Sequence, residues 1–514
     1  MFRIGVDVGG TNTDAVVMEQ RTVRAVVKVP TTPDVMDGLM QALGQVLEAA
    51  ALGPDQVGLV VIGTTQFTNA VIERRHLTQT AVVRLALPAN RCLPPMVDWP
   101  EDLRAAVGEH IFEAGGGFNF DGTPITPLAP AEIARIGTDI RARGIDSIAV
   151  VGVFAPVRDD GEREAARILA EQCPGAGITC SADIGQLGFL ERESASILNA
   201  SLRSLARRTV ESLKDGVGRC GLRCPVFLSQ NDGTLMDAAT AARFPVLTFA
   251  SGPTNSMRGA AFMSGRSEAI VLDIGGTTTD VGLLQKGFPR QASTTADIGG
   301  VRTNFRMPDV FSIGLGGGSL VNEKEDRLHV GPRSVGYELT RRARVFGGET
   351  LTATDIAVAA GRARIGDPAR LAGLDADVVR RALENIESQL ALAVDRTRLS
   401  AEPIPLIAVG GGSILMPARL AGLEVIRPPY FAAANAIGAA IAQTSGEVDR
   451  IYSLESLTRE AALAAAEAEA RAQAASSGAL QDSIVVTERE DVPLAYLRGN
   501  ATRVRVKVVG DLQF

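Results

Sequence analysis

Two short segments of the chain carry the same chemistry-bearing residues at the same spacing. Residues 7–14 read Asp-Val-Gly-Gly-Thr-Asn-Thr-Asp, and residues 273–280 read Asp-Ile-Gly-Gly-Thr-Thr-Thr-Asp. Paired glycines permit positive φ and leave the backbone open to a ligand. Successive N–H groups in such a turn form a concave anion site, and threonine hydroxyls add donors for phosphate oxygens. The two segments therefore predict two phosphate-binding turns.

A carboxylate stands at each end of both segments. Asp7 and Asp273 follow apolar runs, and a carboxylate there would repel phosphate but suits Mg²⁺ or its waters. We therefore expect Asp7 and Asp273 at a magnesium site. Two interpretations of the closing carboxylates, Asp14 and Asp280, are open. They could serve in acid–base chemistry, or they could only close their turns, since Asp is a favoured turn residue.

The apolar runs on either side of each turn predict a strand, a tight turn and a second strand. An ordinary Gly-Gly hairpin has the same pattern, but the repetition of an Asp-ended turn favours the phosphate-binding interpretation. A further apolar strand, 57–62, leads into Gly63-Thr64-Thr65 and a helix that reaches Arg75. The start of this helix could bind an anion, or Thr64 or Thr65 could simply cap it.

The order of predicted elements suggests an α/β protein with an internal duplication. Strands alternate with helices over 1–188, with a loop-rich insertion at about 88–145. Residues 189–448 repeat the order of strand, hairpin and helix as a second lobe, whose last helix could return to the first. Residues 449–514 form a tail with an Ala- and Glu-rich helix followed by strands.

Composition limits the class of protein. The chain has 514 residues, a formal net charge of −7 and few aromatic residues, which argues against nucleic-acid binding. Five scattered cysteines without a Cys-x-x-Cys pair favour reduced thiols in the cytoplasm. The sequence shows neither a signal-peptide pattern nor an apolar stretch of membrane-spanning length, so we expect a cytoplasmic protein that does not contact a membrane.

Several motifs in register resemble one family. They are DVGGTNTDAVV (7–17), GTTQFTNAVIERR (63–75), ASGPTNSMRGA (250–260), LDIGGTTTDVGLL (272–284), SIGLGGGSL (312–320), VGP (330–332) and GGGS (410–413). Over about residues 1–445 the chain resembles the A-type subunit of the hydantoinase/oxoprolinase family, in its short form, within the actin-like ATPase superfamily. The resemblance implies two duplicated actin-like (ribonuclease-H-like) lobes with a cleft between them, plus a small C-terminal α+β tail.

The resemblance also assigns roles to residues. The phosphates of ATP would lie against Gly9, Gly10, Thr11, Asn12, Thr13, Gly275, Gly276, Thr277 and Thr278. Asp7 and Asp273 would carry or orient Mg²⁺. The adenosine would face Gly410, Gly411, Gly412 and Ser413, and Gly316 and Gly317 are further candidates for contact with the nucleotide. The cleft near the γ-phosphate would be lined by Thr64, Thr65 and Asn69.

The activity implied by the resemblance is ATP-dependent phosphorylation of a carbonyl oxygen. The substrate would be a small cyclic amide of the hydantoin, 5-oxoproline or lactam type, opened with the help of a companion subunit. Transfer of the γ-phosphate turns a poor leaving oxygen into a phosphate ester, and the protein's work is positioning and charge neutralisation. The alternatives are a small-molecule kinase or ketone carboxylase subunit on the same fold, and a non-enzymatic switch driven by ATP.

Overall fold

The computed structural model describes residues 2–9, 11–30, 35–292, 296–304, 306–324, 327–400, 402–455, 457–495 and 500–512. Its largest sheet has nine strands among these residues. Across the sheet the order is β23 (Val485–Pro493), β24 (Ala501–Gly510), β22 (Gln443–Ser453), β10 (Thr234–Asp237), β9 (Val226–Ser229), β4 (Val57–Thr64), β1 (Phe2–Val8), β2 (Asn12–Glu19) and β3 (Thr22–Pro30).

A second sheet belongs to the later part of the chain. Its order is β13 (Phe288–Pro289), β12 (Thr279–Gln285), β11 (Ala269–Ile274), β19 (Leu406–Val409), β21 (Leu423–Ile426) and β20 (Arg419–Leu420), and β16 (Val310–Ile313) also pairs with β12. Both sheets begin with an antiparallel hairpin whose first strand pairs in parallel with a later strand: β1 with β4, and β11 with β19. The repeated topology is that of two duplicated lobes.

Two helices lie between the sheets. α12 (Ala434–Ala440) packs on β1, β2 and β4, and α8 (Ser251–Ser264) packs on α12 and on the second sheet. The helices approach closely because glycines stand at their crossing. A Cβ at Gly438 would lie 1.8 Å from the Asn255 carbonyl oxygen, and one at Gly259 would lie 2.1 Å from the Ala434 carbonyl oxygen. α1 (Val35–Ala49) and α6 (Phe189–Arg219) cover the first sheet on its other face.

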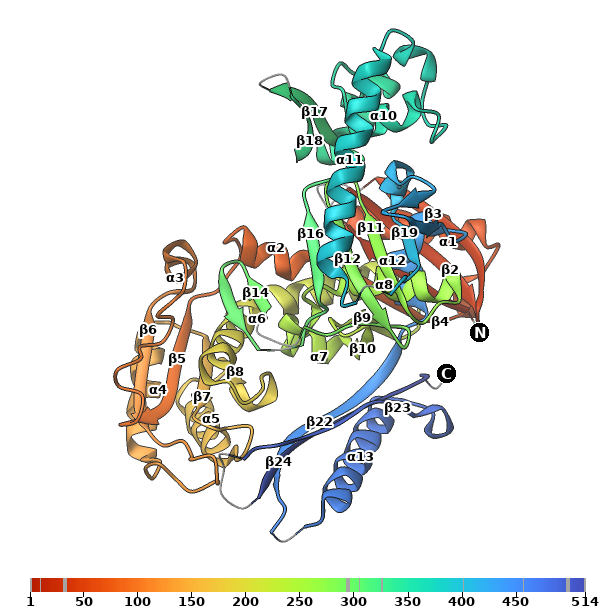
Figure 1. Cartoon of the computed structure of the whole chain (residues 1–514). Coiled ribbons are helices and arrows are strands. Elements are labelled where there is room, and N and C mark those ends of the chain that lie inside the picture. The colour runs from red at the N-terminus through yellow and green to blue at the C-terminus, as the bar shows by residue number, and fades with distance from the viewer. Residues whose placement is uncertain are drawn as a thin grey trace.

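An insertion extends from the first lobe (Figure 1, lower left). It is a parallel sheet in the order β6 (His110–Gly115), β5 (Thr80–Leu87), β7 (Ser147–Gly152) and β8 (Gly177–Cys180). Its helices are α3 (Glu101–Val107), α4 (Pro130–Ala142) and α5 (Asp160–Gln172), and α2 (Gln66–Ile72) leads into it. Its sheet is apolar on both faces, which is typical of a parallel sheet covered by helices.

At the opposite end of the molecule, a subdomain rises from the second lobe (Figure 1, top). It contains the hairpin of β17 (Ser319–Lys324) and β18 (Arg327–Ser334) and the helices α9 (Leu339–Arg342), α10 (Ala353–Ala359) and α11 (Ala376–Thr397).

The short hairpin of β14 (Ala296–Ile298) and β15 (Val301–Thr303) packs on α6. α7 (Ala238–Arg243) follows β10.

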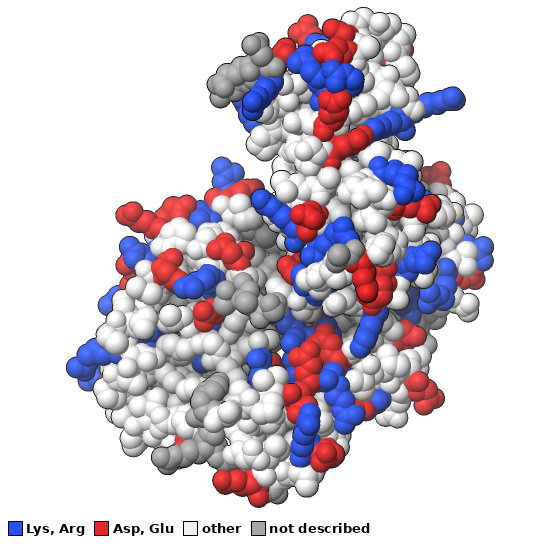
Figure 2. All heavy atoms as spheres, in the orientation of Figure 1, with Lys and Arg blue, Asp and Glu red and all other residues white. Residues whose placement is uncertain are grey.

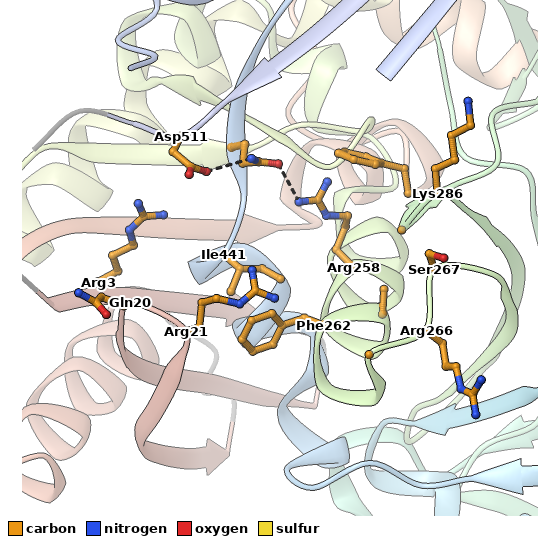
Figure 3. Close-up of a pocket in the computed structure, with 15 residues that line it drawn as sticks. Arg3, Gln20, Arg21, Arg258, Phe262, Arg266, Ser267, Lys286, Ile441 and Asp511 are labelled. Carbon is orange, nitrogen blue, oxygen red and sulfur yellow. Dashed lines mark hydrogen bonds between the residues drawn. The ribbon is translucent and has the colours of Figure 1, made fainter. Parts of the chain in front are cut away.

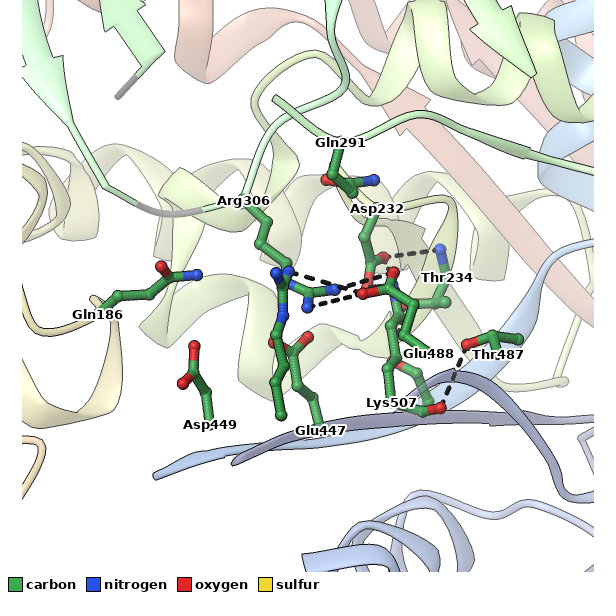
Figure 4. Close-up of polar contacts among 12 residues, drawn as sticks. Gln186, Asp232, Thr234, Gln291, Arg306, Glu447, Asp449, Thr487, Glu488 and Lys507 are labelled. Atoms are coloured by element: carbon green, nitrogen blue, oxygen red, sulfur yellow. Dashed lines mark hydrogen bonds and ion pairs between the residues drawn. The ribbon is translucent and has the colours of Figure 1, made fainter. Parts of the chain in front are cut away.

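The C-terminal segment extends the first sheet. β22 pairs with β10, and α13 (Arg459–Ser476) packs its buried alanines against β22 and β24. Ion pairs fix this segment to the rest of the chain: Lys507 to Asp232 at 2.6 Å, and Arg306 to Glu488 at 2.9 Å (Figure 4). On the face shown in Figure 2, acidic and basic side chains are interspersed.

The sheets do not coincide with the limits predicted at residues 188 and 448. The nine-stranded sheet takes β9 and β10 from beyond the first limit, and it continues through β22, which crosses the second. The division into 1–188, 189–448 and 449–514 stays a proposal about independent units. The predicted α/β class with two actin-like lobes agrees with the architecture.

Candidate nucleotide site

The two predicted turns join hairpins that have the same register. In the first, Asp7 lies directly opposite Asp14, and in the second, Asp273 lies directly opposite Asp280. The same backbone bond closes each turn: Gly9 N–H donates to the Asn12 carbonyl at 3.1 Å, and Gly275 N–H to the Thr278 carbonyl at 2.9 Å. Gly10 lies outside the described residues. We call these two turns, with their flanking carboxylates, the first and second cups.

A third strand lies beside each hairpin, and it places a different side chain opposite the closing carboxylate. On β3, Lys28 lies opposite Asp14 and donates to its Oδ2 at 2.8 Å. On β16, Ser312 lies opposite Asp280 and donates to its Oδ1. The duplicated hairpins thus carry a cation at the first cup and a neutral hydroxyl at the second.

The two cups face each other across one cavity of about 560 Å³. A Cβ placed on Gly276 would lie 3.3 Å from Thr11 Cγ2, so the cups adjoin directly. The structure brings most of the predicted site residues to this cavity. They are Asp7, Gly9, Thr11, Asn12, Asp14, Thr65, Asn69, Asp273, Gly275, Gly276, Thr277, Thr278, Asp280, Gly317, Gly410, Gly411 and Gly412.

Four other predicted residues lie close by but not on the cavity wall. Thr13 and Ser413 are fully buried. Thr64 Oγ1 accepts from the Gln66 N–H at the start of α2 at 3.2 Å. Thr65 is the N-cap residue of α2, makes no side-chain capping bond and lines the cavity. Gly316 packs against the second cup, where a Cβ would lie 2.6 Å from Thr277 N.

The glycine run at 316–318 holds the second cup in place. Gly317 N–H donates to the Gly275 carbonyl at 3.0 Å, and Gly318 N–H to the Gly276 carbonyl at 2.7 Å. The turn after β19 is also tightly fitted, because Gly410 has a φ of 81° and a Cβ there would lie 2.4 Å from Asp273 Oδ1. Glycine is required at both places because the chain approaches itself too closely for a side chain.

Sequence reasoning missed several residues of this cavity. Lys28 comes from the edge strand of the first hairpin, and Asn435 of α12 donates to Asp7 Oδ2 at 3.2 Å from more than 400 positions away. Only the register of β2 against β3 could have indicated Lys28. Large apolar side chains from the second lobe also line the cavity, and they are Tyr337, Leu339, Phe346, Ile365 and Ile414.

Negative charge is in excess on the described wall of the cavity, where four aspartates face Lys28. Burial, with the neighbouring Asp14 next in importance, raises the pKa of Asp7 to about 7, and burial followed by Asp280 raises the pKa of Asp273 to about 7. Burial also raises the pKa of Asp14 and of Asp280, against the opposing effects of Lys28 and Ser312. Like charges opposite one another on paired strands destabilise a sheet, so this arrangement calls for a cation.

The donor set fits Mg²⁺. Carboxylate oxygens are the ligands that this cation prefers, and it usually takes one or two from protein and the remainder from water and phosphate. Within the described part of the chain, no three His, Cys, Asp or Glu side chains cluster as a complete metal cage. Asp7 and Asp273, one from each cup, match a site that is completed by a ligand's phosphates.

The fold and the paired cups define a class: a two-lobed protein of actin-like ATPase architecture with the cavity between its lobes. Residues 3–173 match the hydantoinase/oxoprolinase N-terminal region, and residues 192–397 match the hydantoinase/oxoprolinase family. The chain belongs to the hydantoinase/oxoprolinase family, as the motifs predicted.

The similarity to individual curated relatives is low in sequence identity. The chain is 25% identical to the caprolactamase subunit alpha of Pseudomonas jessenii, over 76% of this chain and 58% of the relative. It is 25% identical to the acetophenone carboxylase gamma subunit of Aromatoleum aromaticum, over 82% of this chain and 64% of the relative. The chain thus spans about 60% of the length of these curated relatives.

A solved structure supports the fold. The ATP-dependent caprolactamase from Pseudomonas jessenii superposes with a TM-score of 0.81 and 20% identity, covering 99% of this chain and 88% of that one. None of the helices in the described ranges is both long enough and apolar enough to cross a bilayer.

Proposed function

We propose that the chain is the ATP-dependent subunit of a cyclic amide hydrolase. It would phosphorylate the carbonyl oxygen of a small hydantoin, 5-oxoproline or lactam so that the ring can be opened with a companion subunit. The observation that carries the proposal is the pair of carboxylate-bearing cups that face one cavity from two lobes. Membership of the family and the names of the caprolactamase relatives support the choice of substrate class.

In this proposal, the cups hold the polyphosphate of ATP. Backbone N–H groups and the hydroxyls of Thr11, Thr277 and Thr278 donate to phosphate oxygens. Asp7 and Asp273 hold Mg²⁺, which supplies neutralisation of phosphate charge. Asn435 orients Asp7 through its hydrogen bond, and Lys28 keeps Asp14 paired.

The proposed reaction is a phosphoryl transfer to the amide oxygen, followed by hydrolysis. The carbonyl oxygen of the amide attacks the γ-phosphorus, ADP leaves, and the amide carbon becomes bonded to a good leaving group. Water then adds to that carbon, the ring carbon–nitrogen bond breaks, and the nitrogen leaves as the amine of the opened chain. A second water attacks the carbonyl carbon of the resulting acyl phosphate, and the carbon–oxygen bond to phosphate breaks. The original carbonyl oxygen therefore ends in inorganic phosphate. The roles of Asp14, Asp280, Thr65 and Asn69 along the cavity stay proposals, with Asp14 and Asp280 as candidates for acid–base work.

A ketone carboxylase subunit is the second candidate. A specific observation favours it, since the match to the acetophenone carboxylase gamma subunit extends over 495 aligned residues. In that case, the activated carbonyl would be that of a ketone, and bicarbonate would be consumed.

An oxygen-labelling experiment separates these functions. The purified chain is incubated with Mg²⁺ and ATP, with and without the product of a neighbouring gene, and with caprolactam, hydantoin or 5-oxoproline labelled with ¹⁸O at the carbonyl. The proposal expects ADP release that depends on the amide, and ¹⁸O in the phosphate released. Dependence on a ketone and bicarbonate would support the second candidate. ATP turnover that no carbonyl compound stimulates would contradict both.

A further inference from the structure

A second cavity of about 580 Å³ lies at the far ends of the two hairpins that carry the cups. Arg3 lies four residues before Asp7 on β1, about 13 Å along the strand, and Lys286 lies six residues after Asp280, just past the end of β12, about 20 Å away. The turn between β2 and β3 and the C-terminal half of α8 complete the wall, together with Gln443 and Asp511 (Figure 3). We call it the basic cavity.

The described wall of the basic cavity carries five cationic side chains and one carboxylate. The cations are Arg3, Arg21, Arg258, Arg266 and Lys286, and the carboxylate is Asp511. In Figure 3, Arg3, Arg21 and Arg258 come from three different segments around the cavity that they line. Arg21 stacks over the Phe262 ring, with its guanidinium carbon 4.9 Å from the ring centroid.

Arg258 is the residue that distinguishes this cavity from a solvated basic surface. Its exposed fraction is 7%, and burial lowers its pKa to about 10. Its guanidinium carbon lies 3.8 Å from the centroid of the Phe288 ring, and Nη2 makes a long contact of 3.4 Å with Gln443 Oε1. Among the described residues, Nη1 is buried without a hydrogen-bond partner. A buried charge of this kind is costly unless it is paired.

The carboxylates nearest to Arg258 are already engaged. Asp232 pairs with Lys507 at 2.6 Å, and Asp511 accepts from Gln443 at 2.9 Å and interacts electrostatically with Arg3. The protein therefore supplies too few anions for the cations that it gathers here. An anion from solution would satisfy Arg258 and would reduce the repulsion among its neighbours.

We propose that the basic cavity binds a small organic anion that carries two or more phosphate or carboxylate groups. Arginine forks suit both groups because two N–H donors match two oxygens. The volume suits a metabolite rather than a protein segment. Because β1, β2, α8 and β12 come from both lobes, the anion would join the lobes at the end opposite the cleft.

The two cavities share α8. Gly252 and Pro253 at its start line the cleft, and Arg258 lines the basic cavity about one and a half turns later. A ligand that shifts α8 changes both sites. By thermodynamic linkage, any effect of the anion on nucleotide affinity is matched by an equal effect of nucleotide on anion affinity.

The test uses the whole chain in EDTA at constant ionic strength, with sodium chloride as the screening control. The probes are inorganic phosphate, pyrophosphate and citrate, followed by calorimetry and by the midpoint of thermal unfolding. We expect saturable binding of at least one of the polyvalent probes and a rise in the midpoint, as mass action requires. Citrate against pyrophosphate distinguishes a carboxylate ligand from a phosphate ligand.

Two variants and a control locate the site. Arg258→Met should weaken probe binding at least tenfold without lowering the unfolding midpoint of the free protein, because it removes a buried cation whose Nη1 has no hydrogen-bond partner among the described residues. Arg21→Met, on a turn, should also weaken binding and guards against a folding defect in the first variant. Arg24→Met is the matched control, because Arg24 pairs with Glu19 outside the cavity.

Two results would overturn the proposal. One is wild-type protein that binds none of the three probes at 20 mM. The other is equal binding by wild type, Arg258→Met and Arg21→Met, which would place the anion elsewhere, for example in the cups. Neither result bears on the proposed enzyme activity, which is measured with Mg²⁺, ATP and a carbonyl substrate.

Discussion

The two ends of the paired hairpins carry cavities of nearly equal size and opposite charge. The cleft between the cups, about 560 Å³, has four aspartates and Lys28 on its described wall, and the basic cavity, about 580 Å³, has five cations and Asp511. The same strands build both. The difference in charge is the basis of the two proposals: a cation with its phosphates in the cleft, and an anion in the basic cavity.

Burial alone does not produce such an imbalance, as a third region shows. Asp232 is as buried as Asp7, and burial by itself would raise its pKa, yet Lys507 and Thr234 hold that pKa at about 2 (Figure 4). At Asp7, burial and the neighbouring Asp14 outweigh the Asn435 hydrogen bond and the more distant Lys28, and the pKa rises to about 7. The Asp232 pair therefore fixes the C-terminal segment to the fold, whereas the carboxylates of the cups belong to the proposed nucleotide site.

The largest effect is expected from removing a carboxylate of the cleft. Asp7→Asn or Asp273→Asn should reduce ATP turnover by about 1000-fold or more, because a metal-directed carboxylate contributes several kcal/mol of charge stabilisation in the transition state. Steady-state ADP release at saturating Mg²⁺ measures this. Asp98→Asn is the control, since Asp98 is exposed and pairs with Arg302. Near-normal turnover in both cleft variants would show that neither carboxylate handles the metal.

The next effect concerns the helix crossing that separates the two cavities. Gly438→Ala would place a Cβ 1.8 Å from a backbone oxygen of α8, and overpacking of this kind should cost about 3 kcal/mol of stability. Thermal unfolding measures the loss. Gly44→Ala, in α1 with nothing within 4 Å of the added Cβ, should instead gain up to about 1 kcal/mol from helix propensity. A tolerated Gly438→Ala would mean that α8 and α12 can separate independently of the cavities.

A pH experiment tests the charge imbalance itself. The pKa of Asp7 is about 7 in the folded chain against an ordinary 3.8, so the folded state binds this proton more tightly. Its contribution to stability is complete below pH 4 and is lost as the pH rises through 7. As the pH rises from 5 to 8 without nucleotide, the wild type should lose the stability that the protonated Asp7 contributes, whereas Asp7→Asn should not. The unfolding free energy of Asp7→Asn, relative to that of wild type, should therefore rise by about 2 kcal/mol over this range.

The opposite slope is expected at Asp232. Its pKa of about 2 means that its stabilising effect is present above pH 4 and is lost as the pH falls toward 2. Asp232→Asn should therefore lose most relative to wild type at neutral pH and least in acid. Parallel pH profiles for Asp7→Asn and Asp232→Asn would contradict the distinction between unbalanced and paired carboxylates.

How far the sequence could predict this molecule depended on how local the signal was. The cups were predicted residue by residue because glycine, threonine and aspartate define a turn by themselves, and the family and the two-lobed α/β class are confirmed. That Thr65 is the N-cap of α2 without a side-chain capping bond, while Thr64 accepts from the Gln66 N–H, could not be predicted from the sequence. Lys28 and Asn435 were not predicted, because strand register and a helix from the distant end of the chain bring them to the cleft.

The basic cavity was beyond sequence reasoning for the same reason. Its arginines come from β1, a turn and α8, and no local spacing relates them. The make-up of the first sheet could not be predicted either, because β9, β10 and β22 join it from later in the chain. The nucleotide and metal roles of the cup residues stay predictions, to which the structure adds that most of these residues line one cavity.

The smallest effect concerns Lys28, which gives the first cup a cation where the second cup has a hydroxyl. Lys28→Met should raise the KM for Mg-ATP about fivefold, because a partly buried ion pair of this kind contributes roughly 1 kcal/mol and its loss leaves Asp14 uncompensated. Arg24→Met on the same strand should leave KM unchanged. If Lys28 only offsets Asp14, the double variant Lys28→Met with Asp14→Asn should recover the affinity that the single variant loses. Failure of that recovery would mean that Lys28 contacts the nucleotide itself, and the cleft would then bind phosphate by a direct cation, as the basic cavity is proposed to do.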